Sequence, residues 1–189
     1  MTRMYSFPAD LCLESPRLQL RPMVAEDAAA WFAIMADPQV MRYWNHGPWQ
    51  VLAEAQAALA EDRDAYAAGQ MLKLGIYRRD NGELIGMTQL FNLEPTSRRG
   101  EIGYCLASCA QGRGYMDEAL TCFIDYLAHG LHLRRLEAEI DPRNQGSART
   151  LERQGFVLEG LLRQRWCVAG ELSDSGLYGL LLDQAPLDG

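Results

Sequence analysis

Two glycines separated by one residue, Gly112 and Gly114, lie between a strand-like stretch and a long helix-like stretch. Glycine lets the backbone turn its N–H groups toward one point with no side chains in the way. The helix that follows adds its free N–H groups and the positive end of its dipole. Together these groups form an anion site suited to a pyrophosphate, to which Arg113 can add a direct contact. An ordinary tight turn has the same pattern, so the motif alone leaves both interpretations open.

Two other kinds of phosphate site do not match this chain. The sequence contains no GxxxxGK[ST], which a P-loop nucleotide enzyme requires. A dinucleotide-binding fold places its glycine turn after the first strand, with an acidic residue about 20 residues further on. Here the glycine turn comes past the middle of the chain, after an expected antiparallel hairpin. We therefore expect neither class.

The elements that must position this turn follow from periodicity and turn residues. Asn81-Gly82 between two alternating runs is a strong hairpin signal, and Asp37-Pro38 is expected to end the first helix. Helices are expected at 26–36, 51–67, 115–131 and 146–154. Strands are expected at 17–21, 71–79, 83–93, 98–106, 135–140, 157–168 and 171–182.

This order of elements indicates one mixed α/β (α+β) domain, with parallel pairing where a helix crosses over between strands. A chain of 189 residues is long enough for a single domain with a substantial core. We assign residues 1–14 to an N-terminal extension, residues 183–189 to a C-terminal tail, and the whole of 1–189 to one domain.

Composition excludes several classes of function. The formal net charge of −7 argues against a general nucleic-acid binder and is compatible with a cationic acceptor. The sequence has neither a secretory signal pattern nor an apolar run long enough to span a membrane, so we expect a cytoplasmic protein. The five cysteines form no CxxC pair, so we expect reduced thiols and no metal site.

Two segments together resemble a known family. Residues 101–106 (EIGYCL) followed by 111–120 (QGRGYMDEAL) resemble the acetyl-CoA motif of GNAT acetyltransferases, Q/R-x-x-G-x-G/A. Downstream, Asn144-x-x-Ser147 and Gln154-Gly155-Phe156 resemble the second cofactor segment of the ribosomal-protein N-terminal acetyltransferase (RimJ/RimL-like) branch. The element order agrees over about 15–182. The chain departs from the pattern at Met116, where Gly or Ala is usual, so this side chain must point away from the phosphates.

The resemblance implies an N-acetyltransferase that takes acetyl-CoA as co-substrate and reacts by direct attack in a ternary complex. It implies a mixed, mostly antiparallel sheet with flanking helices, in which the parallel strands 98–106 and 135–140 splay apart around the pantetheine arm. The residues it assigns to cofactor binding are Tyr104, Cys105, Leu106, Gln111, Gly112, Arg113, Gly114, Tyr115, Met116, Asn144 and Ser147.

Direct attack needs a neutral amine, and a free alkylamine with a pKa of about 10 is almost wholly protonated at neutral pH. A carboxylate can take this proton directly or through water. Glu139, five residues before Asn144, lies where some relatives carry their base, and Glu101 starts the other splayed strand. Glu137 is a weaker third candidate. Each of these residues can also be a solvated side chain on an exposed strand face.

The leaving thiolate needs a proton donor, and Ser147 matches the serine proposed for this role in the RimL-like branch. The alternative for Ser147 is to cap the helix that begins there. Some members of the superfamily use a tyrosine seven residues after the Asn, but that position here is Leu151. Because the family reacts through a ternary complex, we expect no acyl-enzyme on Cys105 or Cys122.

An aromatic loop at 41–49 lies in the region that covers the acceptor end in this fold. Aromatic walls suit a cation or the apolar body of a substrate. Packing of these rings against the sheet is an equally good interpretation. A peptide N-terminus, a polyamine, an amino acid and an aminoglycoside all stay open as acceptors. The candidate acceptor-binding residues are Tyr43, Trp44, His46 and Trp49.

Two alternatives to an enzyme remain at this stage. A non-catalytic acyl-CoA-binding regulator of the same fold would keep the glycine turn without needing a carboxylate base. A plain α/β interaction module would bind no cofactor at all. The closing hairpin also leaves an edge through which a homodimer can form, although an exposed edge alone does not show one.

Overall fold

The computed structural model describes residues 5–182, which form one eight-stranded sheet in the order β1-β2-β3-β4-β5-β6-β8-β7. Every neighbouring pair is antiparallel except β5 and β6, which are parallel. The strands are β1 (Leu13–Glu14), β2 (Leu18–Arg21), β3 (Leu72–Arg78), β4 (Leu84–Glu94), β5 (Arg99–Leu106), β6 (Arg135–Ile140), β7 (Val157–Val168) and β8 (Glu171–Leu181).

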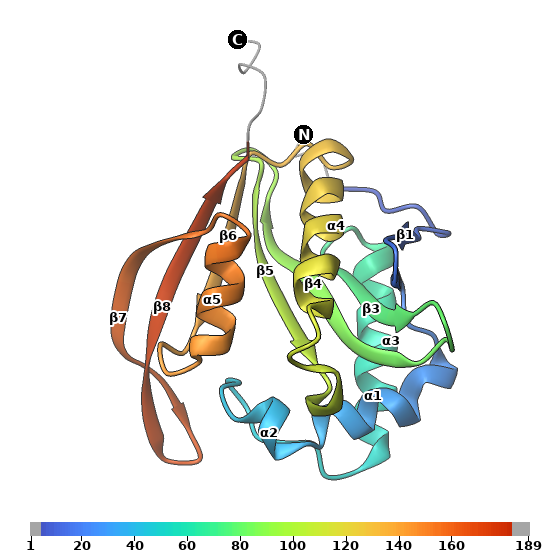
Figure 1. Cartoon of the computed structure of the whole chain (residues 1–189), viewed down its shortest axis with the longest axis horizontal. Coiled ribbons are helices and arrows are strands. Elements are labelled where there is room, and N and C mark those ends of the chain that lie inside the picture. The colour runs from blue at the N-terminus through green and yellow to red at the C-terminus, as the bar shows by residue number, and fades with distance from the viewer. Residues whose placement is uncertain (1–4, 183–189) are drawn as a thin grey trace.

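Helices cover both faces of the sheet (Figure 1). On one face lie α4 (Tyr115–His129) and α5 (Gln145–Arg153), and on the other lie α1 (Ala28–Met35) and α3 (Leu52–Ala67). The short helix α2 (Pro38–Met41) and the 3-10 turns Ala25–Asp27 and Ser108–Ala110 complete the described elements. No helix within 5–182 combines the length and the apolar character needed to cross a bilayer.

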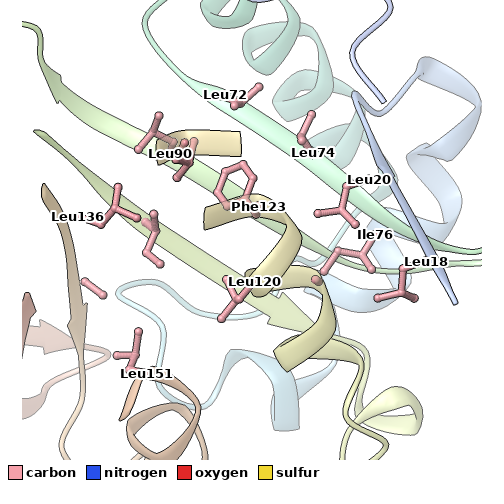
Figure 2. Packing of buried hydrophobic residues seen from close by; sticks show 14 of the residues in the cluster. Leu18, Leu20, Leu72, Leu74, Ile76, Leu90, Leu120, Phe123, Leu136 and Leu151 are labelled. Atoms are coloured by element: carbon pink, nitrogen blue, oxygen red, sulfur yellow. The ribbon is translucent and has the colours of Figure 1, made fainter. Parts of the chain in front are cut away.

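The larger of two hydrophobic clusters lies between the sheet and α4. Leu120 and Phe123 of α4 are fully buried against inward-facing leucines and isoleucines of the strands (Figure 2). The alternation in β2 shows why these residues form a strand, since Leu18 and Leu20 are buried while their neighbours are not. This packing fixes α4, and with it the turn at its N-terminus, against the sheet.

Strands β5 and β6 pair over only three residues. The parallel register runs from Arg99 opposite Arg135 to Glu101 opposite Glu137, and beyond this point the two strands diverge. Strand β6 instead pairs along its length with β8, up to Ile140 opposite Gly176. The splayed pair expected from the family resemblance is therefore present.

The predicted order of elements is confirmed, with three corrections. Pro38 does not simply end a helix: it begins α2, because Asp37 caps this helix by accepting a hydrogen bond from the Gln39 N–H at 2.8 Å. Part of the expected 1–14 extension packs onto the domain, since Phe7 and Leu11 are buried in the main cluster. The helix expected at 115–131 ends at His129. The expected tail, 183–189, lies outside the described residues.

Candidate active site

The glycine turn has the backbone geometry that an anion site needs. Gly112 and Gly114 both adopt left-handed backbone angles, with φ of 73° and 75°, and Gly114 directly precedes the first turn of α4. Within residues 5–182, the N–H groups of Gly112, Arg113 and Gly114 donate to no other group. The start of α4 adds N–H groups that have no partner in the helix. Several exposed donors therefore converge where the helix dipole is positive.

Arg17, which lies 96 residues before Arg113 in the sequence, holds this turn in place. Its Nη1 donates to the Arg113 carbonyl at 3.0 Å, and its guanidinium lies 4.5 Å from the centre of the Tyr115 ring. Its Nε donates to the Glu118 carboxylate at 2.6 Å, and Ser15 donates to the same carboxylate at 2.7 Å. The short segment between β1 and β2 thus fixes the conformation of the turn.

Met116 does not block the turn. Its side chain is partly buried and packs against the main hydrophobic cluster between α4 and the sheet. The side chain therefore points away from the converging N–H groups, as cofactor binding requires.

The splayed strand β5 contributes backbone and one hydroxyl. The Leu106 carbonyl accepts a hydrogen bond from Gln111 Nε2 at 3.1 Å, which links the end of β5 to the turn. Cys105 is buried in the second hydrophobic cluster, and burial raises the pKa of its thiol to about 12. A thiol in this state is a poor nucleophile at neutral pH, which agrees with a reaction that forms no acyl-enzyme at Cys105.

At the start of α5, Asn144 and Ser147 have separate roles. Asn144 is the N-cap, because its Oδ1 accepts the Ser147 N–H at 3.1 Å. The alternative that Ser147 caps this helix is therefore wrong. The Ser147 hydroxyl instead lies 2.8 Å from the Tyr104 hydroxyl on β5, and either oxygen can be the donor. Burial raises the pKa of Tyr104, so this phenol stays protonated at neutral pH.

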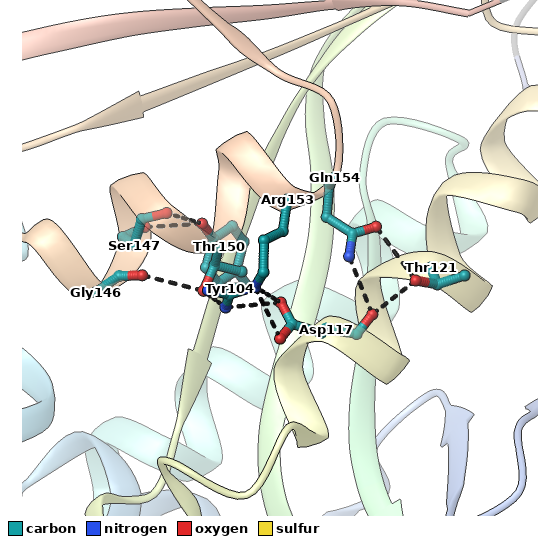
Figure 3. Close-up of polar contacts among 8 residues, drawn as sticks. All are labelled: Tyr104, Asp117, Thr121, Gly146, Ser147, Thr150, Arg153 and Gln154. Carbon is teal, nitrogen blue, oxygen red and sulfur yellow. Dashed lines mark hydrogen bonds and ion pairs between the residues drawn. The ribbon is translucent and has the colours of Figure 1, made fainter.

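A polar bridge joins α5 to α4 (Figure 3). Arg153 Nη2 lies 2.9 Å from the Asp117 carboxylate, and Gln154 Nε2 donates to the Asp117 carbonyl at 3.3 Å. Thr121 in turn donates to Gln154 Oε1. Exposed ion pairs add little stability, so we interpret this bridge as positional. It joins the C-terminal end of α5 to the first turn of α4, next to the glycine turn.

Glu101 lies where the parallel pairing ends, and one of its oxygens accepts a hydrogen bond from Asn92 at 2.9 Å. Asn92 reaches it from an irregular part of β4 and has a left-handed φ of 49°. Burial raises the pKa of Glu101, and the negative charges of Glu139 and Glu137 raise it further. The Asn92 hydrogen bond and the charge of Arg165 oppose this shift.

Glu139 lies in a different environment. Its Oε1 accepts hydrogen bonds from Trp166 Nε1 and Ser175 Oγ, both at 2.7 Å, and lies 3.6 Å from Arg165 Nε. Glu137 is held in ion pairs with Arg99 and Arg135, at 3.0 and 2.8 Å. Glu137 is therefore the least suited of the three to accept a proton from a substrate.

One cavity of about 570 Å³ brings together Glu101, Glu139, Asn144 and the two hydroxyls, whereas the glycine turn is not part of its wall. Its walls include Glu101, Glu139, the Tyr104–Ser147 hydroxyl pair and the loop residues Tyr43, Trp44 and His46. Trp49 is not part of this wall. Its ring packs edge-on against Trp31 at 5.8 Å, so the packing interpretation holds for Trp49. Within 5–182, no cluster of His, Cys, Asp and Glu could hold a metal ion.

Several site residues could not be found from the sequence alone. The hydroxyl of Tyr104 is among them, because the family resemblance assigns a role only to the backbone of this part of β5. Asn92 carries one weak signal, since Asn favours left-handed positions. Trp166 and Ser175, which hold Glu139, come from the closing hairpin, where no motif marks them.

The comparisons with known proteins agree with this geometry. The acetyltransferase (GNAT) domain family matches residues 17–157. The chain is 33% identical to the uncharacterized N-acetyltransferase p20 of Bacillus licheniformis, over 89% of this chain and 95% of that protein. It is 31% identical to the ribosomal protein uS5-alanine N-acetyltransferase of Escherichia coli, over 89% of each chain. The structure of Mycobacterium smegmatis RimJ in complex with CoA-disulfide superposes with a TM-score of 0.79, at 28% identity over 87% of this chain and 81% of that one.

Proposed function

Since this chain belongs to the GNAT acetyltransferase family and transfers an acetyl group from acetyl-CoA to an amine, we propose that its acceptor is the α-amine of a peptide N-terminus. The observation that carries this proposal is the cavity, which has aromatic walls and opens to solvent. Of the four acidic side chains in its wall, Asp141 and Glu171 are paired with Arg143, which leaves Glu101 and Glu139 for a cation. Acidic and aromatic groups recognise a cationic amine. The similarity to an enzyme named as an alanine N-acetyltransferase of ribosomal protein uS5 supports the same acceptor class.

The residues fit acetyl-CoA. The free N–H groups of residues 112–116 suit its pyrophosphate, and the backbone of β5 beyond Glu101, no longer paired with β6, suits its pantetheine arm. Asn144 has its Oδ1 engaged in the cap and keeps its Nδ2 to donate to the cofactor. When bound, acetyl-CoA supplies an acetyl thioester that a neutral amine can attack directly.

We assign proton removal to Glu101. A general base works best when its pKa approaches the working pH, and the environment of Glu101 raises its pKa in that direction. In Glu139, by contrast, Oε1 already accepts hydrogen bonds from Trp166 and Ser175 and lies 3.6 Å from Arg165, so this oxygen is not available to a substrate proton. Glu101 thus takes a proton from the acceptor ammonium and leaves the nitrogen with a free lone pair.

We assign protonation of the leaving sulfur to Ser147. Its hydroxyl lies in the wall of the cavity and is bonded to the Tyr104 hydroxyl. After Ser147 has given up its proton, the neighbouring phenol can replace it through the same hydrogen bond, and the phenolate that this leaves takes a proton from water in the cavity. The two hydroxyls therefore act as a pair, with Ser147 as the donor and Tyr104 as its source.

The Ser147→Ala variant is expected to lower kcat by about tenfold to a hundredfold, while the Kd for acetyl-CoA changes little. Asn144 caps α5, so the fold does not depend on the Ser147 hydroxyl. Tyr104→Phe should produce a smaller loss, because Ser147 can then exchange its proton with water. Steady-state rates from thiol release, with calorimetric binding of acetyl-CoA as the control, measure both effects. A fully active Ser147→Ala enzyme would remove this residue from the chemistry.

The acceptor is tested by comparing substrates at equal concentration. Three kinds of acceptor are each incubated with enzyme and acetyl-CoA. They are peptides with a free α-amine, the same peptides with a blocked α-amine and an internal lysine, and spermidine. Mass spectrometry then locates the acetyl group. We expect acetylation only at the free α-amine, with N-terminal Ala and Ser peptides as the first to test. Preferred acetylation of spermidine would assign the enzyme to small cationic acceptors instead.

A further inference from the structure

The closing hairpin, β7 and β8, forms one wall of the acceptor cavity. Arg165, Trp166 and Ser175 all line the cavity, although they come from both strands. The pairing of β7 with β8 is irregular between Leu162 and Trp166, where Gln164 adopts a left-handed φ of 51°. Such irregularities re-aim side chains, and they are common beside active sites.

All three contacts from this hairpin to Glu139 fall on the same oxygen. Trp166 Nε1 and Ser175 Oγ donate to Oε1, and the Arg165 guanidinium lies nearest to Oε1 as well. The second oxygen, Oε2, accepts no hydrogen bond from any residue in 5–182. The hydrogen bonds to Oε1 hold the Glu139 side chain. Because the side chain is still 16% exposed and lines the cavity, a ligand can reach it. One oxygen is thus an anchor, and the other is free for a ligand.

We propose that Trp166 and Ser175 are positioning residues that hold Glu139 by Oε1 so that Oε2 binds the ammonium form of the acceptor. This inference rests on the proposed function and divides the work between the two carboxylates. Glu139 binds the cation, and Glu101 takes one proton from the bound ammonium. The hairpin is therefore part of acceptor recognition.

The arrangement also explains why a tryptophan suits this position. The indole N–H fixes the carboxylate, and the ring forms part of the wall beside the bound cation. Arg165 is 51% exposed and lies at a looser 3.6 Å. This side chain can swing away when the acceptor ammonium arrives, whereas Trp166 and Ser175 stay bonded to Oε1. A cationic acceptor at Oε2 thus meets only a weakly held guanidinium at Oε1 of the same carboxylate.

The Trp166→Phe variant tests the proposal, because it keeps an aromatic ring and removes only the indole donor. We expect the KM for a free-α-amine peptide to rise about tenfold, with kcat and the Kd for acetyl-CoA unchanged. Ser175→Ala should act in the same direction. Cys167→Ala is the matched control, since Cys167 is an exposed neighbour on β7 outside the cavity, and its KM should equal that of the wild type.

A double-mutant cycle separates positioning from a general loss of structure. In a Glu139→Gln background, Trp166→Phe should no longer change the KM, because the group it positions has lost its charge. Additive effects in the double mutant would overturn the inference, as would a Trp166→Phe enzyme with an unchanged KM. Failure of the proposed function looks different: the wild-type enzyme itself would then acetylate no free-α-amine peptide.

Discussion

Replacing Glu101 by Gln is expected to slow acetyl transfer at neutral pH by about a hundredfold or more, while acetyl-CoA binding is retained. Gln has nearly the same shape and can still accept the hydrogen bond that Asn92 donates to Glu101 at 2.9 Å in the wild-type protein. The variant therefore removes the ability to take a proton without emptying the site. The measurement is kcat/KM for a free-α-amine peptide, with binding of acetyl-CoA as the control.

The pH dependence gives this prediction a direction. A base acts only when it is deprotonated, so the rate rises with pH through the pKa of Glu101. Burial places that pKa above its ordinary value, and Glu139 and Glu137 add to the shift, whereas Asn92 and Arg165 reduce it. In Glu101→Gln this rising limb should disappear. In Glu139→Gln it should move to lower pH, because a charge that raises the pKa of Glu101 has been removed.

The two carboxylate variants also test the division of roles. Glu94→Gln is the neutral comparison, since Glu94 lies at the end of β4 outside the cavity. If Glu139→Gln removes the rising limb and Glu101→Gln leaves it unchanged, the base has been assigned to the wrong residue. If neither variant changes the limb, proton removal does not depend on these carboxylates.

Local patterns in the sequence predicted the larger elements and the glycine turn. The long helix α4, the Asn81-Gly82 hairpin and the closing hairpin each carry their signal within one segment, as periodicity or as turn residues. The elements that were missed, β1 and α2, have only two and four residues, too few to show a period. The start of α2 also depends on a distant contact, because its N-cap, Asp37, accepts a hydrogen bond from Ser108 at 2.6 Å.

The candidate site divides in the same way. The phosphate turn is local, and the sequence reveals it because φ values near 75° require glycine. The choice between Glu101 and Glu139 could not be made from spacing, because it depends on what surrounds each carboxylate. Trp166 and Ser175 reach Glu139 from 27 and 36 residues away along the chain. Tyr104 and Ser147 are separated by 43 residues, so their hydroxyl pair exists only in the folded chain.

Gly114→Glu is the second substitution with a large expected effect, a loss of acetyl-CoA affinity of about a hundredfold or more. The new carboxylate would lie beside the N–H groups that suit the pyrophosphate and would repel its charge. A side chain at φ +75° also costs about 1–2 kcal/mol of stability. Open space around the new Cβ, whose nearest neighbour is Arg17 at 3.6 Å, means that the domain should still fold.

A matched control separates these two effects. Gly82 has almost the same φ, +72°, also with open space around it, but lies in the β3–β4 turn. Gly82→Glu therefore adds the same charge at the same backbone strain, away from the glycine turn. Both variants should lose a similar amount of thermal stability, and only Gly114→Glu should lose the cofactor.

The most direct test is therefore calorimetric titration of acetyl-CoA into the wild-type protein, Gly82→Glu and Gly114→Glu. We expect one site with micromolar affinity in the first two proteins and no measurable heat of binding in a folded Gly114→Glu. Equal affinity in all three proteins would contradict this expectation, because the pyrophosphate would then bind away from the glycine turn at the start of α4.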